Sequence, residues 1–253
     1  MIALTRAVPP SLAECELTHL EREPIDIGRA VEQHRQYEVA LQSLGCDVVR
    51  LPPTPDLPDS IFVEDTAVVL PEIAIITRPG APSRRSETET TAKALESYRM
   101  VAEIKSPGTV DGGDVLVIGR YIFVGHSKRT NRQGVLQLRE IASAYGYHVH
   151  SVAVWGCLHL KSAVTQVDSG TVLLNPSWVD VTLFSECEVI EVDSSEPFGA
   201  NALRVGRDVI YSTAFPLTGR RLTDRGINVH TVEVSELAKA EAGVTCCSIL
   251  IAV

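Results

Sequence analysis

The stretch Ile73-Ala74-Ile75-Ile76-Thr77, with Arg78–Arg85 (RPGAPSRR) and Ser86–Tyr98 behind it, contains the unit that decides the fold. Its apolar, β-branched run predicts a strand, and the glycine and prolines after it predict a turn. Ser86 with Glu89 three residues later is a capping-box pattern, which predicts the start of a helix. The same order of strand, turn and helix recurs from three later strands: Tyr121–Val124, Thr171–Leu174 and Val209–Tyr211.

A further strand is predicted before each of these units. These are Ser60–Val63, Val115–Ile118, Ser162–Thr165 and Ala202–Val205, and the last segment, Cys246–Val253, fits the same position. The chain is therefore expected to form about five β-rich units, each with a helix, in one domain over residues 1–253. Repeats of this length are typical of radial or stacked architectures.

Polar residues keep a constant phase within this repeat. Asp65, Asp111, His159, Asn201 and Cys246 all lie near the strands of the second set, and neighbours among them are 42 to 48 residues apart. If the units are arranged radially, these side chains converge on one axis. A thiol, an imidazole and carboxylates would then share one cavity, as covalent chemistry requires.

Composition limits the classes of partner. A net charge of −9 opposes nonspecific nucleic-acid binding, and no apolar run approaches membrane-spanning length. The six cysteines have no framework spacing and no Cys-x-x-Cys pair, which indicates reduced thiols, a cytoplasmic location and no structural zinc site.

Three residues have the chemistry of a covalent catalyst. Cys246 is the better nucleophile of the two adjacent cysteines, because alternation along a strand sends Cys247 to the other face, into the packing. His159 is a candidate general acid and base, and Asp111 a candidate partner that orients and charges it. The alternatives are two cysteines in a core strand, a buried structural histidine and an aspartate that caps a turn.

Charged residues inside apolar surroundings predict the substrate. Glu64 and Asp65 interrupt an apolar run, and buried carboxylates need a cationic partner or ligand, for which a planar guanidinium is the best match. Arg84 and Arg129 follow strands in equivalent turns and could bind a carboxylate, although each alone is more typical of a surface.

Blocks of sequence in this order resemble the dimethylarginine dimethylaminohydrolase family of guanidino-group-modifying enzymes. The blocks are Leu57–Asp65 (LPDSIFVED), Ile76–Arg85 (ITRPGAPSRR), Asp111–Leu116 (DGGDVL), Val124–Asn131 (VGHSKRTN), Leu158–Ser162 (LHLKS) and Thr245–Ser248 (TCCS). The resemblance implies a five-bladed α/β propeller with the active site on its pseudo-fivefold axis.

The resemblance also implies a role for individual residues. Cys246 is implied as nucleophile, His159 as general acid and base, and Asp111 as its partner. The residues implied to bind substrate are Asp65 for the guanidinium, Phe62 and Glu64 lining the site, Arg84 and Arg129 for the α-carboxylate, and Asp59, Ala240 and Leu17 for the α-amino end.

The implied reaction hydrolyses methylated arginines to citrulline and methylamines through a covalent cysteine adduct, without a metal or organic cofactor. Zinc could inhibit by capturing the thiolate and imidazole, and the sequence leaves open whether it does. The sequence leaves open a deiminase of arginine or another small guanidine, a noncatalytic protein that binds arginine derivatives, and a cysteine peptidase, which the paired arginines and buried carboxylates disfavour. A homodimer is also left open.

Overall fold

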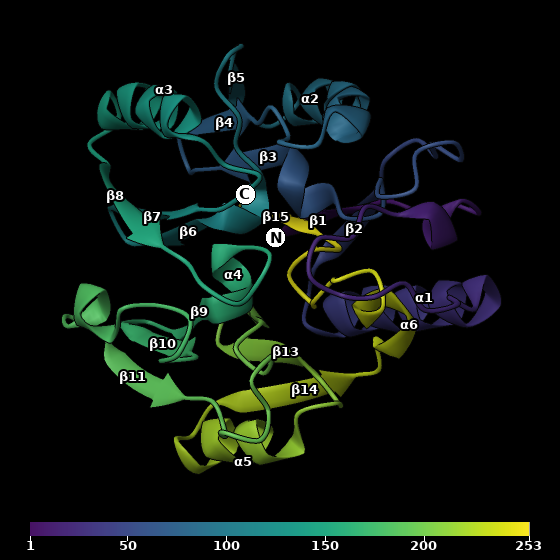
Figure 1. Cartoon of the computed structure of the whole chain (residues 1–253), viewed down its shortest axis with the longest axis vertical. Helices are drawn as coiled ribbons and strands as arrows, with labels where there is room; N and C mark the ends of the chain where they lie inside the picture. The colour runs from purple at the N-terminus through teal and green to yellow at the C-terminus, as the bar shows by residue number, and fades with distance from the viewer. Residues whose placement is uncertain (253) are drawn as a thin grey trace.

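The computed structural model describes residues 1–252, which form a ring of five small sheets around a central axis (Figure 1). By sheet, from the inner strand outward, the strands are β15 (Ile249–Ile251), β1 (Ile2–Thr5) and β2 (Asp47–Arg50); β3 (Ala67–Val69), β4 (Ile73–Ile76) and β5 (Met100–Glu103); β6 (Val115–Ile118), β7 (Tyr121–His126) and β8 (His148–Ala153); β9 (Val164–Asp168), β10 (Thr171–Leu174) and β11 (Glu188–Glu191); and β12 (Ala202–Val205), β13 (Asp208–Ser212) and β14 (Asn228–Val232). The α-helices are α1 (Ile27–Ser43), α2 (Thr88–Leu95), α3 (Arg132–Ser143), α4 (Leu160–Ala163), α5 (Pro216–Asp224) and α6 (Ser235–Ala238). The 3-10 helices are η1 (Leu12–Glu14), η2 (Val63–Thr66), η3 (Pro82–Glu87), η4 (Gly112–Asp114) and η5 (Val181–Phe184).

All five sheets have one topology. The inner strand pairs antiparallel with the middle strand, and the middle strand pairs parallel with the outer one. A parallel neighbour requires a crossover connection, and in the third sheet α3 supplies it. This helix buries Val135 and Leu138 in one cluster with Ile122 and Val149 of the sheet. The predicted five-bladed α/β propeller is confirmed.

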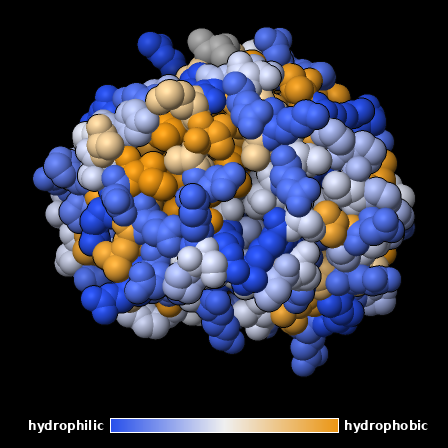
Figure 2. Space-filling model, turned by 90° about the horizontal axis from the view of Figure 1, so that it is seen from above, coloured by the Kyte–Doolittle hydropathy of each residue, from blue (hydrophilic) through white to orange (hydrophobic). Residues whose placement is uncertain are grey.

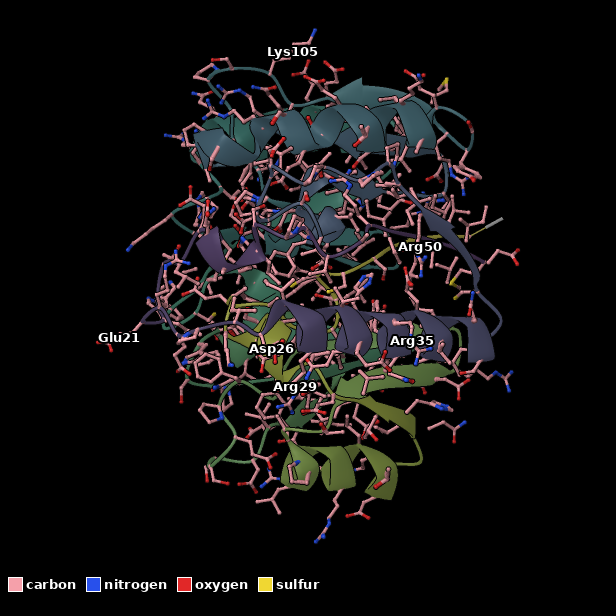
Figure 3. The ribbon with its side chains drawn as sticks, turned by 90° about the vertical axis from the view of Figure 1, so that its right-hand side faces the viewer. Glu21, Asp26, Arg29, Arg35, Arg50 and Lys105 are labelled. Atoms are coloured by element: carbon pink, nitrogen blue, oxygen red, sulfur yellow. The ribbon has the colours of Figure 1, made fainter. Side chains whose placement is uncertain are left out.

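The two ends of the chain share one sheet. Residues Ile2 to Leu4 of β1 pair with β15, with Ile2 opposite Ile251, and both ends lie near the centre of the ring in Figure 1. The last strand thereby closes the ring. Helix α1 lies outside this sheet. Its N-cap residue is Asp26, whose carboxylate accepts from Arg29 N at 3.0 Å, and the helix presents Arg29 and Arg35 on its outer side (Figure 3).

Three inner strands begin later than the sequence predicted. Residues 60–63 were expected as a strand, but Val63 starts η2 and the strand begins at Ala67; likewise α4 occupies Leu160–Ala163 before β9. Cys246 and Cys247 lie in the turn before β15. The apolar residues were predicted as strands, but a helical turn buries apolar side chains equally well. In η2 the hydroxyl of Thr66 donates to Val63 O at 2.7 Å, so this backbone carbonyl has a partner without a neighbouring strand.

Two helix predictions also need correction. Ser86 does not cap a helix, because the chain is already in η3 there and α2 begins at Thr88 without a side-chain cap. Pro82 favours that earlier start, since its fixed φ suits the first turn of a helix. The unit from Thr171 has only η5 where a full helix was expected.

Among the residues that the structure describes, no helix has the length and apolar character that crossing a membrane would require.

Candidate active site

The five polar residues that recur at a constant spacing in the sequence all precede inner strands. Asp65 lies in η2, Asp111 and His159 are the N-cap residues of η4 and α4, Asn201 precedes β12, and Cys246 precedes β15. Three of them, Asp65, His159 and Cys246, line one cavity, and Asp111 lies buried behind His159. Asn201 instead bonds Thr245 and the carbonyl of Lys161, so it supports the turn that carries Cys246.

His159 is held by Asp111. Its Nε2 lies 3.1 Å from Asp111 Oδ2, and the other oxygen of Asp111 accepts from Gly80 N at 2.8 Å. Burial alone would lower the pKa of His159, but the charges of Asp65, Asp111 and Asp114 raise it to about 9. The imidazole is therefore protonated at neutral pH.

Asp65 is an ionised carboxylate in the floor of the cavity. Its Oδ2 lies 2.6 Å from Arg84 Nη1, and its Oδ1 accepts from Gly113 N at 2.9 Å. Burial would raise its pKa, but His159 and Arg84 together hold that pKa below the ordinary value. A Cβ at Gly113 would lie 2.5 Å from His159 Nδ1, so only glycine lets the backbone approach both side chains.

The two cysteines differ in environment. Cys246 is half-buried and faces the cavity, and its sulfur accepts from Gly243 N at 3.4 Å. Cys247 is 1% exposed and packs in the apolar cluster beneath α1. Burial, with the charges of Glu64 and Asp65, raises the pKa of Cys246 to about 12, so the resting protein has a thiol beside an imidazolium.

Glu64 lies outside the lining of this cavity. It bonds Lys161 Nζ at 2.6 Å and Thr245 Oγ1 at 2.7 Å, and it lines a cavity of about 230 Å³ formed by the inner strands along the axis. Its effect on Cys246 is electrostatic, through the thiol's pKa.

Arg84 and Arg129, the two arginines predicted to bind the substrate α-carboxylate, differ in how many partners each has within the protein. Arg84 is 4% exposed, and besides Asp65 it bonds Glu87 at 2.9 Å and the carbonyls of Asp59 and Phe62. Arg129 also lines the cavity, and its Nη2 donates to Thr18 Oγ1 at 3.1 Å. Arg129 is thus the guanidinium with fewer partners in the protein.

Residues 16–20 of the N-terminal segment, here called the lid, close the cavity. Glu241 accepts the backbone N–H groups of Thr18 at 2.9 Å, Leu20 at 2.6 Å and also His19, and its own φ of 60° is unusual for a residue other than glycine. Asp59 accepts from Glu16 N at 3.1 Å. With the lid in this position the cavity is only about 20 Å³, room for one or two water molecules.

The lining of the cavity only partly matches the substrate-binding residues predicted from the sequence. Asp59, Phe62 and Ala240 line the cavity as expected, but Leu17 packs against the apolar cluster under α1. The prediction missed Glu16, Leu158, Glu241 and Ala242, which line the cavity as well. Glu241 had no sequence signal, because its partners lie more than 200 residues away.

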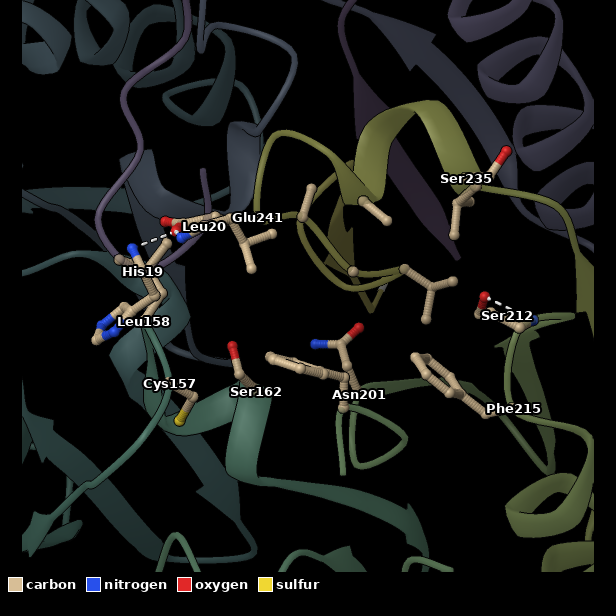
Figure 4. Close-up of a pocket in the computed structure, with 17 residues that line it drawn as sticks. His19, Leu20, Cys157, Leu158, Ser162, Asn201, Ser212, Phe215, Ser235 and Glu241 are labelled. Carbon is tan, nitrogen blue, oxygen red and sulfur yellow. Dashed lines mark hydrogen bonds between the residues drawn. The ribbon is translucent and has the colours of Figure 1, made fainter. Parts of the chain in front are cut away.

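A larger apolar cavity of about 240 Å³ lies next to this one (Figure 4). The two share Leu158, Glu241 and Ala242, and the labelled Phe215, Asn201 and Ser212 line the larger one. Cys246 and His159 line only the smaller cavity, which is therefore the candidate site of covalent chemistry.

Within residues 1–252, one group of three side chains could hold a metal ion: Asp65, Asp111 and His159 have ligand atoms within 4.8 Å of one another. Asp111 and His159 already bond each other and Asp65 already pairs with Arg84.

Fold and site together define a class of protein: an α/β propeller with a cysteine, a histidine and carboxylates gathered on its axis. Residues 17–164 match the family model described as N,N dimethylarginine dimethylhydrolase, eukaryotic. The N(G),N(G)-dimethylarginine dimethylaminohydrolase of Streptomyces coelicolor is 42% identical over 250 residues, which cover 98% of this chain and 95% of that protein.

Two solved structures are similar to the whole chain. One is a cysteine-to-serine variant of the Pseudomonas aeruginosa enzyme with citrulline, with a TM-score of 0.92 and 33% identity over 98% of this chain and 97% of that one. The other is a histidine-to-glycine variant of a dimethylarginine dimethylaminohydrolase as its adduct with S-methyl-L-thiocitrulline, with a TM-score of 0.92 and 34% identity over 98% of both chains. The chain belongs to the dimethylarginine dimethylaminohydrolase family.

Proposed function

We propose that this protein hydrolyses Nω-methylated arginines, both asymmetric dimethylarginine and monomethylarginine, to citrulline and dimethylamine or methylamine. The observation that carries the proposal is the small cavity that the Cys246 thiol, the Asp65 carboxylate and the His159 imidazole line together, with Asp111 bonded to His159. Membership of the family and its complexes with citrulline and thiocitrulline support the same reaction.

Binding of the substrate prepares the nucleophile. Asp65 accepts hydrogen bonds from the guanidinium of the substrate. The positive charge of this guanidinium offsets the negative charges of Glu64 and Asp65, which raise the pKa of Cys246. The thiol then loses its proton to water. The guanidinium carbon is a poor electrophile, so it has to be held rigidly over the sulfur.

His159 acts twice. The Cys246 thiolate forms a bond to the guanidinium carbon, and the imidazolium of His159 gives its proton to the methylated nitrogen, which leaves as a neutral amine. A thiouronium adduct remains. The neutral His159 then takes a proton from water, the hydroxide adds to the carbon, and the carbon–sulfur bond breaks to give citrulline and the free cysteine.

The remaining substrate contacts come from other residues around the cavity. Arg129 binds the α-carboxylate, and Arg84 adds positive charge while it holds Asp65 in place. Asp59, the backbone at Ala240 and the lid segment that contains Leu17 face the α-amino end. The lid has to open for entry, since the closed cavity is far smaller than an arginine side chain.

Purified protein given asymmetric dimethylarginine and, separately, arginine, with citrulline measured by colour reaction, tests the proposal. We expect turnover of the methylated substrate. Turnover of arginine alone would contradict it and favour a deiminase, and binding without turnover would favour a noncatalytic protein.

We also propose that residues 1–253 work as one domain, in the cytoplasm. The pairing of β1 with β15 supports the single domain, and the six free cysteines suit a reducing compartment. We further propose a homodimer, for which the apolar patch among polar side chains in Figure 2 offers a surface. Light scattering should then give twice the chain's 27.4 kDa.

A further inference from the structure

Asp114 is a fully buried carboxylate that the proposed reaction does not use. It lies three residues after Asp111, at the end of η4. Its two oxygens accept from two different segments: Oδ1 from Leu160 N at 3.0 Å and Oδ2 from Ser127 Oγ at 2.5 Å. Burying a carboxylate is costly unless it is hydrogen-bonded, and these two bonds offset that cost.

The first bond fixes the backbone next to the catalytic histidine. His159 is the N-cap residue of α4, where a side chain commonly accepts a free N–H of the first turn, but its ring makes no such bond. Asp114, from the neighbouring sheet, supplies the missing acceptor to Leu160 N. The imidazole of His159 is thereby left free to face Asp111 and the cavity.

The second bond fixes the loop that carries Arg129, the residue proposed to bind the substrate carboxylate. Ser127 Oγ, which donates to Asp114, accepts from Arg129 N at 3.0 Å and from Thr130 N at 3.2 Å. Thr130 Oγ1 in turn accepts from Asp111 N at 3.1 Å. The loop is thus tied both to the carboxylate of Asp114 and to the backbone of Asp111.

We propose that Asp114 is a positioning residue that sets His159 and Arg129 in register with each other, so that one buried carboxylate couples proton transfer to binding of the substrate carboxylate. This inference rests on the proposed function. Two further titratable groups interact electrostatically with Asp114, the Asp111 carboxylate and the Cys157 thiol. Gly125 leaves the room that the network needs, since a Cβ there would lie 2.7 Å from Asp114 Oδ1 and 2.9 Å from Leu160 Cβ.

The substitution Asp114→Asn tests both bonds at once. Ser127 Oγ already accepts two N–H groups and Leu160 offers only a donor, so the new NH₂ group opposes one of them in either orientation. We expect kcat to fall at least about tenfold and KM to rise severalfold. The His159 titration, followed by NMR in the unliganded protein, should move below its midpoint near 9, because one of the negative charges that raise it is gone.

Each bond can also be tested separately, which keeps the proposal open to refutation if Asp114→Asn does not fold. Ser127→Ala releases the Arg129 loop only, so KM should rise about five- to tenfold with kcat within about threefold of wild type. Gly125→Ala strains the bond to Leu160, so kcat should fall more than KM rises.

The matched control is Glu196→Gln. Glu196 is also a buried carboxylate that accepts N–H groups at a helix start, from Leu217 at 2.9 Å and Thr218 at 2.7 Å, but it lies outside the site. We expect lower stability with unchanged kcat, KM and His159 titration. If folded Asp114→Asn behaves like this control, or if Ser127→Ala and Gly125→Ala both keep wild-type kcat and KM, the positioning role is wrong. An inactive wild-type protein would instead refute the proposed function, and the NMR titration would still decide the role of Asp114.

Discussion

At the scale of single residues, the adjacent cysteines Cys246 and Cys247 have different roles. Cys246 faces the cavity and Cys247 packs under α1, a division that alternation of faces predicted although the segment is a turn and not a strand. The prediction survives because successive side chains in this turn also point to different sides.

We expect Cys246→Ser to lose at least about a thousandfold in kcat, because the hydroxyl is a far weaker nucleophile than the thiolate. Cys247→Ser is the matched variant. It should keep kcat within about threefold and lower the free energy of unfolding by about 1 to 2 kcal/mol, since it buries a hydroxyl in an apolar cluster. Citrulline assays and urea unfolding measure the two effects. Wild-type turnover in Cys246→Ser would contradict the covalent mechanism.

The charge of His159 predicts the alkaline limit of activity. Asp65, Asp111 and Asp114 outweigh burial and raise its pKa to about 9, so the imidazolium that protonates the leaving amine is present below that pH and lost above it. We expect kcat/KM for dimethylarginine to fall as pH rises through about 9, because kcat/KM follows the protonation of the free enzyme. Asp111→Asn should move that limit to lower pH and reduce kcat at least about tenfold.

The exposed pair Asp208 and His230, 2.8 Å apart, provides the control for this experiment. Asp208→Asn removes the same kind of contact far from the cavity and should leave the pH profile unchanged. A profile that Asp111→Asn does not move would show that another group sets the alkaline limit.

At the scale of elements, the sequence predicted which segments form the sheets but not how each catalytic residue is presented. Val115–Ile118, Thr171–Leu174 and Ala202–Val205 have the predicted bounds, since no helical turn occupies any of their residues. The inner strands after Asp65 and His159 start late because η2 and α4 occupy residues that the apolar runs predicted as strand. These turns depend on bonds to distant residues, such as Leu160 N to Asp114, and such bonds leave no local pattern.

Within the lid, the backbone N–H groups of residues 18–20 are all held by the carboxylate of Glu241. Glu241→Gln replaces an acceptor oxygen by a donor, so at least one of the three N–H bonds from residues 18–20 must be lost. We expect KM to rise about tenfold with a smaller change in kcat, and trypsin to cut faster after Arg22. The control is Glu233→Gln, an exposed glutamate paired with Arg29. Unchanged cleavage and KM in Glu241→Gln would mean that other contacts hold the lid.

At the scale of the whole molecule, the active site exists only when the ring is closed. Each sheet contributes one residue ahead of its inner strand, and the inner strands of neighbouring sheets contact one another, β9 with β6 and β12, and β15 with β3. The repeat made this convergence predictable from spacing alone. Closure of the ring was harder to predict from the sequence, because it pairs residues 2–4 with residues 249–251 and no local sequence pattern indicates that pairing.

Closure of the ring predicts how stability and activity are linked. Ile251 is fully buried in a cluster with Leu4 and Val63, so Ile251→Ala should lower the free energy of unfolding by about 2 to 4 kcal/mol. Leu250, the partly exposed neighbour on β15, is the matched site, and Leu250→Ala should cost clearly less. Because Cys246 lies in the turn that leads into β15, activity and the far-ultraviolet circular dichroism signal should be lost in a single urea transition in both variants. Equal costs at the two positions, or activity lost well before the fold, would show that the last strand is not what holds the site together.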